Sequence, residues 1–130
     1  MILEEFTSNF IINFLGQTQI ELKSTHNKLC IPIIKRMCLK MLNGIKFGDI
    51  KVCGDIIIDG HHRYISALIT NSKIGSVPSH TTTATTLHDW THVEFDVNDW
   101  DSPSKIVYLN EQDAAYNNID IEKLTQMNKI

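Results

Sequence analysis

The sequence lacks an uninterrupted apolar run of the roughly 18 to 20 residues that a membrane-spanning helix needs. It also lacks a basic segment near its start, where Glu4 and Glu5 stand instead of the cations of a secretory signal peptide. These two absences predict a soluble protein that is made in the cytosol and has no membrane partner.

Cysteine is scarce as well. Cys30, Cys38 and Cys53 form an odd, widely spaced set without a C-x-x-C pair. Such a set argues against a disulfide framework and against a structural zinc knuckle. We expect the three side chains to be reduced thiols in the core.

An excess of positive charge is also missing, because the formal net charge is −3. This balance argues against indiscriminate coating of nucleic acid. The average hides an asymmetry, since residues 1–88 hold nine Lys and Arg against six Asp and Glu, whereas residues 89–130 hold three against nine. The acidic part has three interpretations: a solvated face, a docking surface for a basic partner, or a cover over a basic cleft.

The chain does contain enough apolar material for one core. A length of 130 residues with 42% hydrophobic content fits a single compact domain over residues 1–130 and leaves no room for two independent cores.

One stretch combines a strand, a polar turn and a helix start. Residues 56–58 are three consecutive isoleucines, which predict a strand buried on both faces, and Asp59-Gly60 is a turn dipeptide. A helical face then follows, formed by Tyr64, Ile65, Leu68 and Ile69. The change of period places His61, His62 and Arg63 at or just before a helix N-terminus.

A helix N-terminus attracts anions, because its backbone N–H groups are free and the helix dipole is positive there. Arg63 adds a guanidinium that can bind phosphate or carboxylate with two parallel hydrogen bonds. The other interpretation is purely structural, with Asp59 as an N-cap, His61 and His62 as surface residues and Arg63 as a solvated charge.

The segment from Gly48 to Ile69 resembles the core of the ParB/sulfiredoxin superfamily, and the likeness covers about forty residues when the preceding helix is included. Members share a short hairpin, a polar turn and a following helix, and they use the turn to bind nucleotide phosphates. Asp59-Gly60-His61-His62-Arg63 is most similar to the D-G-H-x-R form found in ParB-like free serine kinases and in many unassigned ParB-like domains.

The sequence departs from two branches of that superfamily. Sulfiredoxins carry a catalytic Cys directly after the Gly, where this chain has His61, so sulfinic acid repair is not expected. Chromosome-partitioning ParB proteins carry G-E-R-R, and this chain lacks the acidic residue and the second Arg. CTP-gated clamping of DNA is therefore not expected either.

A helix is predicted over residues 2–15, ending at Gly16, because apolar residues recur at helical spacing: Ile2, Leu3, Phe6, Phe10 and Phe14. Alternation in residues 17–23 predicts a half-buried strand, and the polar residues 24–28 predict a loop.

Pro32 suits the first turn of a second helix, which we expect to run to Leu42. Lys35, Arg36 and Lys40 would project from its polar side. The superfamily resemblance implies that Lys35 and Arg36 help to hold phosphates, and a solvated face is the alternative.

A β-hairpin is predicted between residues 50–52 and 56–58, with Gly54-Asp55 suited to a type II′ turn. The hydroxyl-rich residues 77–86 have no helical period and predict an edge strand or a mobile loop over the site.

His88 and His92 form an H-x-x-x-H pair, which would share one face of a helix and could bind a metal. The alternation of Val93, Phe95 and Val97 instead favours an edge strand that begins by His92. We expect the tryptophans, Trp90 and Trp100, to anchor the core, with a substrate-stacking surface as the alternative.

Near the C-terminus, Asn110 is expected to cap a helix through Tyr116, and Asp120 a helix through Met127. Residues 108–114 resemble the final segment of ParB-like domains at the C-termini of secreted bacterial toxins. This second resemblance implies a protein that is delivered into a target cell and is held by a cognate inhibitor protein.

Together these patterns predict an α+β (mixed α/β) fold with a small mixed sheet and flanking helices. The expected function is hydrolysis of ATP or a similar nucleotide, or transfer of its phosphoryl group. Gly60 would let the backbone approach the phosphate, and Arg63 would neutralise its charge, with His61 or His62 donating to oxygens or moving a proton. Asp59 would repel a phosphate, so it is expected to bind Mg²⁺ or to accept a hydroxyl proton.

Two other functions remain open at this point. The same turn could bind a phosphodiester of DNA or RNA, which would make the protein a nuclease that acts as a toxin. It could also belong to a non-catalytic module in which nucleotide binding changes the affinity for a partner.

Overall fold

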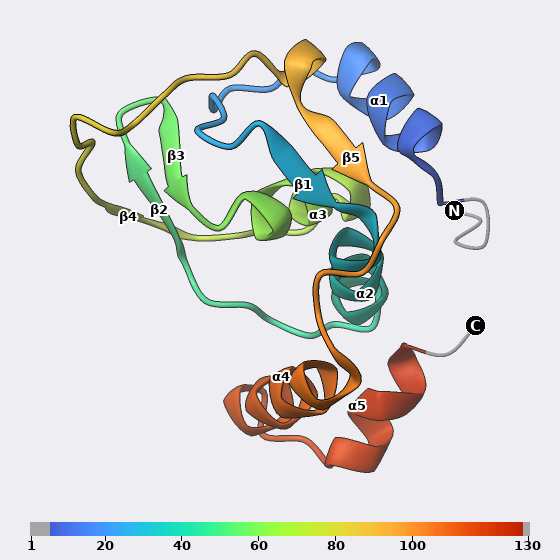
Figure 1. Cartoon of the computed structure of the whole chain (residues 1–130). Helices are drawn as coiled ribbons and strands as arrows, with labels where there is room; N and C mark the ends of the chain where they lie inside the picture. The colour runs from blue at the N-terminus through green and yellow to red at the C-terminus, as the bar shows by residue number, and fades with distance from the viewer. Residues whose placement is uncertain (1–5, 129–130) are drawn as a thin grey trace.

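The structure is a computed structural model that describes residues 6–128 (Figure 1). Its elements follow one another as α1 (Ser8–Gln17), β1 (Lys28–Cys30), α2 (Ile31–Leu42), β2 (Ile50–Cys53), β3 (Ile56–Asp59), α3 (His61–Thr70), β4 (Ser76–Pro78), the 3₁₀-helix η2 (Trp90–His92), β5 (Glu94–Asp96), α4 (Pro103–Tyr116) and α5 (Ile121–Met127). Helices pack against small sheets, so the α+β prediction is confirmed.

One sheet has three strands in the order β3-β2-β4. β2 and β3 form the predicted antiparallel hairpin, whose turn contains Gly54 at φ +60°. A side chain rarely adopts this conformation, which explains the glycine. β4 pairs in parallel with the other edge of β2. Residues 79–87 then continue without a strand, so the hydroxyl-rich segment is mostly a loop.

A second sheet joins segments that lie far apart in the sequence. β1 and β5 pair in parallel, with Leu29 opposite Phe95, and both side chains are buried. Val93 is buried just before β5, whereas Val97 is 71% exposed because the strand has already ended at Asp96. The predicted alternation of buried side chains therefore holds for Val93 and Phe95 but not for Val97.

The main core lies between α2, α3 and the two sheets. Ile34 of α2, Ile57 of β3 and Ile65 of α3 are completely buried within it. Only the central isoleucine of β3 is fully buried, so the prediction of a strand buried on both faces was wrong. The hairpin stands at the edge of the molecule (Figure 1), and Ile56 and Ile58 are only partly buried.

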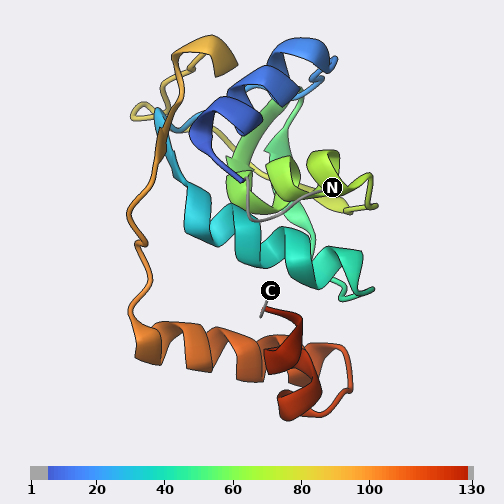
Figure 2. The same ribbon diagram turned by 90° about the vertical axis from the view of Figure 1, so that its right-hand side faces the viewer.

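The C-terminal helices α4 and α5 form a hairpin with a small core of its own, in which Ala114 and Leu124 pack against Ile45. Figure 2 shows α2 running between this hairpin and the layer that contains the sheets. The loop from residue 97 to residue 102 connects the two parts along one side.

Several predicted elements are confirmed. The second helix, α2, begins at Ile31, so Pro32 lies in its first turn, and it ends at Leu42; both were predicted. α5 is capped by Asp120, whose carboxylate accepts a hydrogen bond from the N–H of Glu122 at 2.8 Å. Cys30 and Cys38 are buried free thiols, whereas Cys53 is only partly buried.

Other predictions were wrong. Residues 18–22 contain no strand, and the only pairing of the predicted 17–23 segment is a single bridge between Lys23 and Ile56. α1 continues past Gly16 to Gln17. The predicted residues 2–5 of that helix lie outside the described part of the chain.

The start of α4 was also predicted wrongly. Ser102 caps this helix by accepting a hydrogen bond from the N–H of Lys105, and Pro103 occupies its first turn. Asn110 lies inside the helix and is buried. The signal at Ser102-Pro103 is the usual one for a helix start, since Pro fits where no intrahelical donor is needed.

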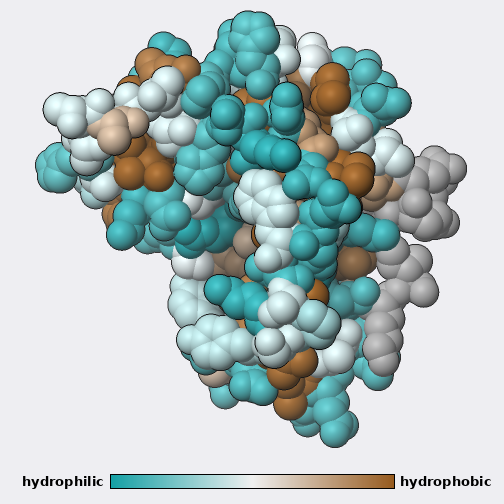
Figure 3. Space-filling view, in the orientation of Figure 1, coloured by the Kyte–Doolittle hydropathy of each residue, from teal (hydrophilic) through white to brown (hydrophobic). Residues whose placement is uncertain are grey.

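Within residues 6–128, no helix combines the length and the apolar composition that spanning a bilayer requires. Figure 3 shows a mostly hydrophilic face in the orientation of Figure 1, with apolar residues in separate small groups.

Candidate functional site

The five residues Asp59 to Arg63 form the transition from β3 to α3, as the change of sequence period predicts. Gly60 is the residue at which the chain turns, with φ +99°, and it is the N-cap of α3. Asp59 is the last residue of β3. It lies one position too early to cap the helix, so the purely structural alternative, in which Asp59 serves as the N-cap, was wrong.

Glycine is required at position 60 for two reasons. Its positive φ is unfavourable for other residues. A Cβ atom there would also lie 2.6 Å from Cγ2 of Ile50 and 2.8 Å from Nη2 of Arg63. The backbone of the turn is therefore pressed against the sheet on one side and against the guanidinium on the other.

The start of α3 has no side-chain cap. The first helical hydrogen bond runs from the N–H of Tyr64 to the oxygen of Gly60. Within the described residues, the N–H groups of His61, His62 and Arg63 have no hydrogen-bond partner. Three adjacent free donors at the positive end of a helix dipole are the usual arrangement for binding an anionic oxygen.

Arg63 is fixed beside this helix start. Its Nη1 donates to the backbone oxygens of Gly48 and Asp49 at 3.1 and 3.2 Å. Its Nη2 lies 3.5 Å from a carboxylate oxygen of Asp59, whose side chain is 64% exposed. The ion pair with Asp59 is long and exposed to solvent, so the guanidinium can still contact a further anion beside the free N–H groups.

His61 is in the core and not on the surface, with an exposed fraction of only 2%. Its Nε2 accepts a hydrogen bond from the N–H of Thr25 at 3.0 Å. Burial, and then the neighbouring His26 and His62, lower the pKa of His61 to about 3. Because Nε2 is the acceptor, the proton of the neutral ring is on Nδ1. That buried Nδ1 has no hydrogen-bond partner in the described structure.

His62 has a similar arrangement. Its Nε2 accepts from the N–H of Cys30, the N-cap residue of α2, at 2.9 Å. Burial and then His26 lower the pKa of His62 to about 4, against a smaller opposite effect of Asp101. Both histidines of the turn are therefore neutral near pH 7, and both use Nε2 to hold a neighbouring segment in place.

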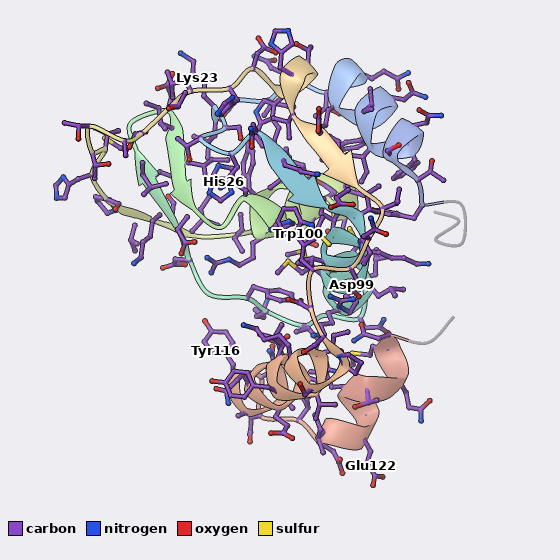
Figure 4. The ribbon with its side chains drawn as sticks, viewed as in Figure 1. Lys23, His26, Asp99, Trp100, Tyr116 and Glu122 are labelled. Carbon is purple, nitrogen blue, oxygen red and sulfur yellow. The ribbon has the colours of Figure 1, made fainter. Side chains whose placement is uncertain are left out.

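A cavity of about 550 Å³ opens beside these histidines. Its walls are Ile58 of β3, residues 25–28, threonines of the 82–86 segment, His88 and Trp100. His26 stacks on His61 with ring centroids 3.9 Å apart, and Trp100 makes a T-shaped contact with His62 at 5.6 Å. This cavity, the aromatic cavity, therefore lies beside the start of α3, where Figure 4 labels His26 and Trp100.

A second, smaller cavity of about 240 Å³ lies on the other side, between α2, α4 and Arg63. Arg36 reaches it, but its guanidinium is paired with Asp99 and with Asp101, the latter at 3.0 Å. The hydrogen bond from Arg36 also lowers the pKa of Asp99. The buried Lys40 contacts Asp113 at 2.7 Å.

These contacts bear on the predicted role of the α2 cations. Arg36 and Lys40 are engaged by carboxylates of the acidic C-terminal third, which matches the interpretation of that third as a cover. Lys35 lines a different cavity, together with Pro32 and Leu39, in which no residue of the turn takes part. The structure does not bring Lys35 together with Arg63.

A magnesium ion at Asp59 would need further ligands. No group of three or more His, Cys, Asp or Glu side chains in residues 6–128 is arranged to hold a metal. Mg²⁺ is usually held by one or two carboxylates together with substrate phosphates and water, and it does not require such a group. The exposed Asp59 carboxylate, next to the free N–H groups, fits that mode.

The H-x-x-x-H pair does not form a helical metal site. Trp90 to His92 is a single 3₁₀ turn, capped by Asp89, whose carboxylate accepts from the N–H of Thr91 at 2.9 Å. His88 precedes this turn and forms an isolated bridge with Ser24. The two imidazoles are therefore not one helical turn apart on a common face.

The tryptophans differ from each other. Trp90 packs against the core and donates from Nε1 to the oxygen of Leu22 at 2.8 Å, as predicted. Trp100 is 46% exposed at the aromatic cavity, so its expected place in the core was wrong. The sequence offered no signal for His26, which lies in a polar loop.

Comparisons of the chain with family models, with curated proteins and with solved structures find no match.

Proposed function

We propose that the protein binds a nucleotide by placing its phosphate at the start of α3, and that it hydrolyses the nucleotide or transfers its phosphoryl group. ATP or a similar triphosphate is the proposed ligand. The observation that carries the proposal is the uncapped helix start, with three free N–H groups beside a fixed guanidinium.

Each part of the turn contributes to phosphate binding. Gly60 permits the positive φ and the close contact with Ile50 and Arg63 through which the chain enters α3. The N–H groups of His61, His62 and Arg63 point out of the helix end, where the dipole favours negative charge. The Arg63 guanidinium adds charge-assisted hydrogen bonds, which are about twice as strong as neutral ones.

The histidines act differently from a simple acid/base pair. Since Nε2 of each ring is occupied as an acceptor, a proton can be given or taken only at Nδ1. Their low pKa values make them neutral hydrogen-bond donors near pH 7 and keep positive charge on Arg63 alone. We assign His61 to support of the turn and His62 to hydrogen bonding toward the ligand.

Asp59 is the proposed group for proton transfer or metal binding. Its exposed carboxylate lies at the mouth of the turn and carries only a long contact to Arg63. When bound there, Mg²⁺ would neutralise charge on the phosphates. Without the metal, Asp59 is placed to accept the proton of an attacking hydroxyl or water.

The D-G-H-x-R resemblance to the ParB/sulfiredoxin superfamily supports the same proposal. Nuclease activity is the second candidate because a phosphodiester could bind the same N–H groups. It ranks lower, since a polynucleotide needs a path of free cations, and Arg36 and Lys40 are already paired with carboxylates.

A thermal-shift series tests the proposal. A nucleotide at 100 times its Kd should add about 2.7 kcal/mol to the free energy of unfolding, which raises the melting temperature. ATP, GTP, CTP and UTP would each be tested with and without Mg²⁺. Arg63→Ala should weaken ATP binding in calorimetry by about 10- to 100-fold, the usual effect of losing a charged hydrogen bond.

The controls separate binding from catalysis. Lys123→Ala removes an exposed cation of α5, in the C-terminal helical hairpin, and should leave the affinity unchanged. Phosphate release from ATP and cleavage of DNA and RNA would be followed in parallel. If no nucleotide shifts the melting curve at millimolar concentration, the nucleotide proposal fails. Binding without turnover of any substrate would point to the non-catalytic module.

A further inference from the structure

Two aromatic rings at the aromatic cavity each contact the ring of a histidine of the turn. His26 is exposed to solvent and lies flat on His61, with the ring planes 12° from parallel. Trp100 is exposed as well, and it meets His62 edge to face, with an angle of 88° between the rings. Both rings are open to solvent at the cavity, so each can make a further contact.

Both rings are held in fixed positions. Nε1 of Trp100 donates to Oδ2 of Asp96 at 2.9 Å, so the indole cannot turn freely in solvent. The loop that carries His26 is closed by Ser24, whose Oγ donates to the oxygen of His26 at 2.7 Å and accepts from its N–H at 3.1 Å. An exposed aromatic ring that is already ordered loses little entropy when a ligand stacks on it.

The cavity has the size and chemistry for a nucleoside. Its volume of about 550 Å³ lies within the usual range for small-molecule sites. Thr82, Thr85 and Thr86 contribute hydroxyl groups, and Asn27 contributes an amide. These groups can donate to and accept from the hydroxyls of a ribose and the polar edge of a base.

The position of the cavity connects it with the phosphate site. Ile58, which lines it, precedes Gly60 by two residues. His61 and His62, whose rings contact His26 and Trp100, also carry two of the free N–H groups at the start of α3. A ligand with a planar ring in the cavity and a phosphate at the start of α3 would therefore contact neighbouring groups of the same turn.

We infer that the aromatic cavity binds the base of a free nucleotide, which stacks on Trp100 while its phosphate occupies the start of α3. This inference rests on the proposed phosphate site and adds to it the base-binding part. The role of the two histidines follows: through their ring contacts they set the positions of the aromatic rings at the cavity.

A fluorescence titration tests the inference, because the chain has only two tryptophans. In a Trp90→Phe protein, Trp100 is the sole indole and reports on its own surface. ATP and AMP should quench this fluorescence, and inorganic tripolyphosphate should bind without quenching it. Since Trp90 packs against the core, the affinities of all ligands are also measured by calorimetry on the wild-type protein.

Trp100→Ala provides the second readout. It should weaken ATP by about tenfold or more, the usual effect of removing a stacking partner, and leave the affinity for tripolyphosphate unchanged. Trp100→Phe should retain most of the ATP affinity. Tyr116→Ala is the matched control, because it removes an exposed aromatic ring on α4, which Figure 4 shows away from Trp100.

The possible failures are distinguishable. If tripolyphosphate binds as tightly as ATP, or if Trp100→Ala leaves the ATP affinity unchanged, the base site is wrong and the phosphate site stands. If neither ligand binds, the proposed function itself fails. A short single-stranded RNA that quenches Trp100 when ATP does not would overturn the assignment to a free nucleotide.

Discussion

The imidazole of His26 lies on the imidazole of His61, with ring centroids 3.9 Å apart. A second histidine, His62, follows in the chain and also contributes to the low pKa of His61. Three imidazoles therefore gather at one place, and the added proton of any of them would be unfavourable for the others. The arrangement is stable only while His61 and His62 are neutral.

This relationship predicts a loss of stability in mild acid. An unfolded histidine has a pKa near 6.5, whereas the folded values are about 3 for His61 and about 4 for His62. Between these limits the unfolded chain binds more protons than the folded one. The stabilising contribution is complete above about pH 6.5 and is lost as the pH falls toward 4 and then 3.

Urea denaturation at pH 7, 6, 5 and 4.5 would measure this effect. The free energy of unfolding should fall steadily over the series. His62→Gln keeps an acceptor for the N–H of Cys30 and removes one titrating group, so it should reduce the slope against pH. A slope that is identical in His62→Gln and wild type would contradict a neutral, buried His62.

A second prediction concerns Gly60. Gly60→Ala should destabilise the protein by about 2 kcal/mol or more, because the new Cβ meets Ile50 and Arg63 at a residue whose positive φ is itself unfavourable. Gly16→Ala is the control, since Gly16 lies in α1 and has nothing within 4 Å of an added Cβ. It should stabilise the helix by about 0.5 to 1 kcal/mol. Equal melting temperatures for the two variants would contradict the geometry of the turn.

The acidic cover, by which we mean the carboxylates of Asp99, Asp101 and Asp113 that pair with cations of α2, gives a third prediction. Asp113→Asn removes the partner of Lys40, whose side chain is only 5% exposed, and should cost about 3 kcal/mol because it leaves a buried charge unpaired. Asp55→Asn breaks the contact to Lys23, in which both side chains are 60% exposed, and should change stability little. Chemical denaturation of both variants compares a buried with an exposed pair. A loss of similar size in both would contradict the cover.

Asp59→Asn gives a fourth prediction and separates catalysis from binding. Asp59 is exposed and is not the helix cap, so the melting temperature should stay close to that of the wild type. If Asp59 accepts a proton or binds Mg²⁺, turnover should fall by about 100-fold or more. Nucleotide affinity should be kept or increase, because a carboxylate near a phosphate is repulsive. Undiminished turnover in a stable variant would remove the assigned role of Asp59.

The local part of the site could be predicted from sequence. Residues 56–69 change from the period of a strand to that of a helix within one short stretch. This change places a helix start, with its free N–H groups, directly after Gly60. The alternative role of Asp59 as N-cap could not be tested from sequence, because either Asp59 or Gly60 can cap the helix, and only the backbone shows that Gly60 does.

The rest depends on contacts between distant segments, which no local pattern contains. β1 and β5 are three-residue strands, too short to show a period, yet their pairing brings the loops of His26 and Trp100 to the same cavity. The charge asymmetry of the chain was visible in the sequence. It did not indicate that Asp113 would contact Lys40, or that Lys35 would lie elsewhere.

The central claim is that the backbone at the start of α3 binds phosphate, and amide NMR tests it most directly. Inorganic tripolyphosphate would be titrated into ¹⁵N-labelled protein and followed in two-dimensional ¹H–¹⁵N spectra. We expect the N–H signals of His61, His62 and Arg63 to shift the most, and downfield, as they gain a charged acceptor. Binding that leaves these three signals in place while others move, or no shift at millimolar concentration, would contradict the claim.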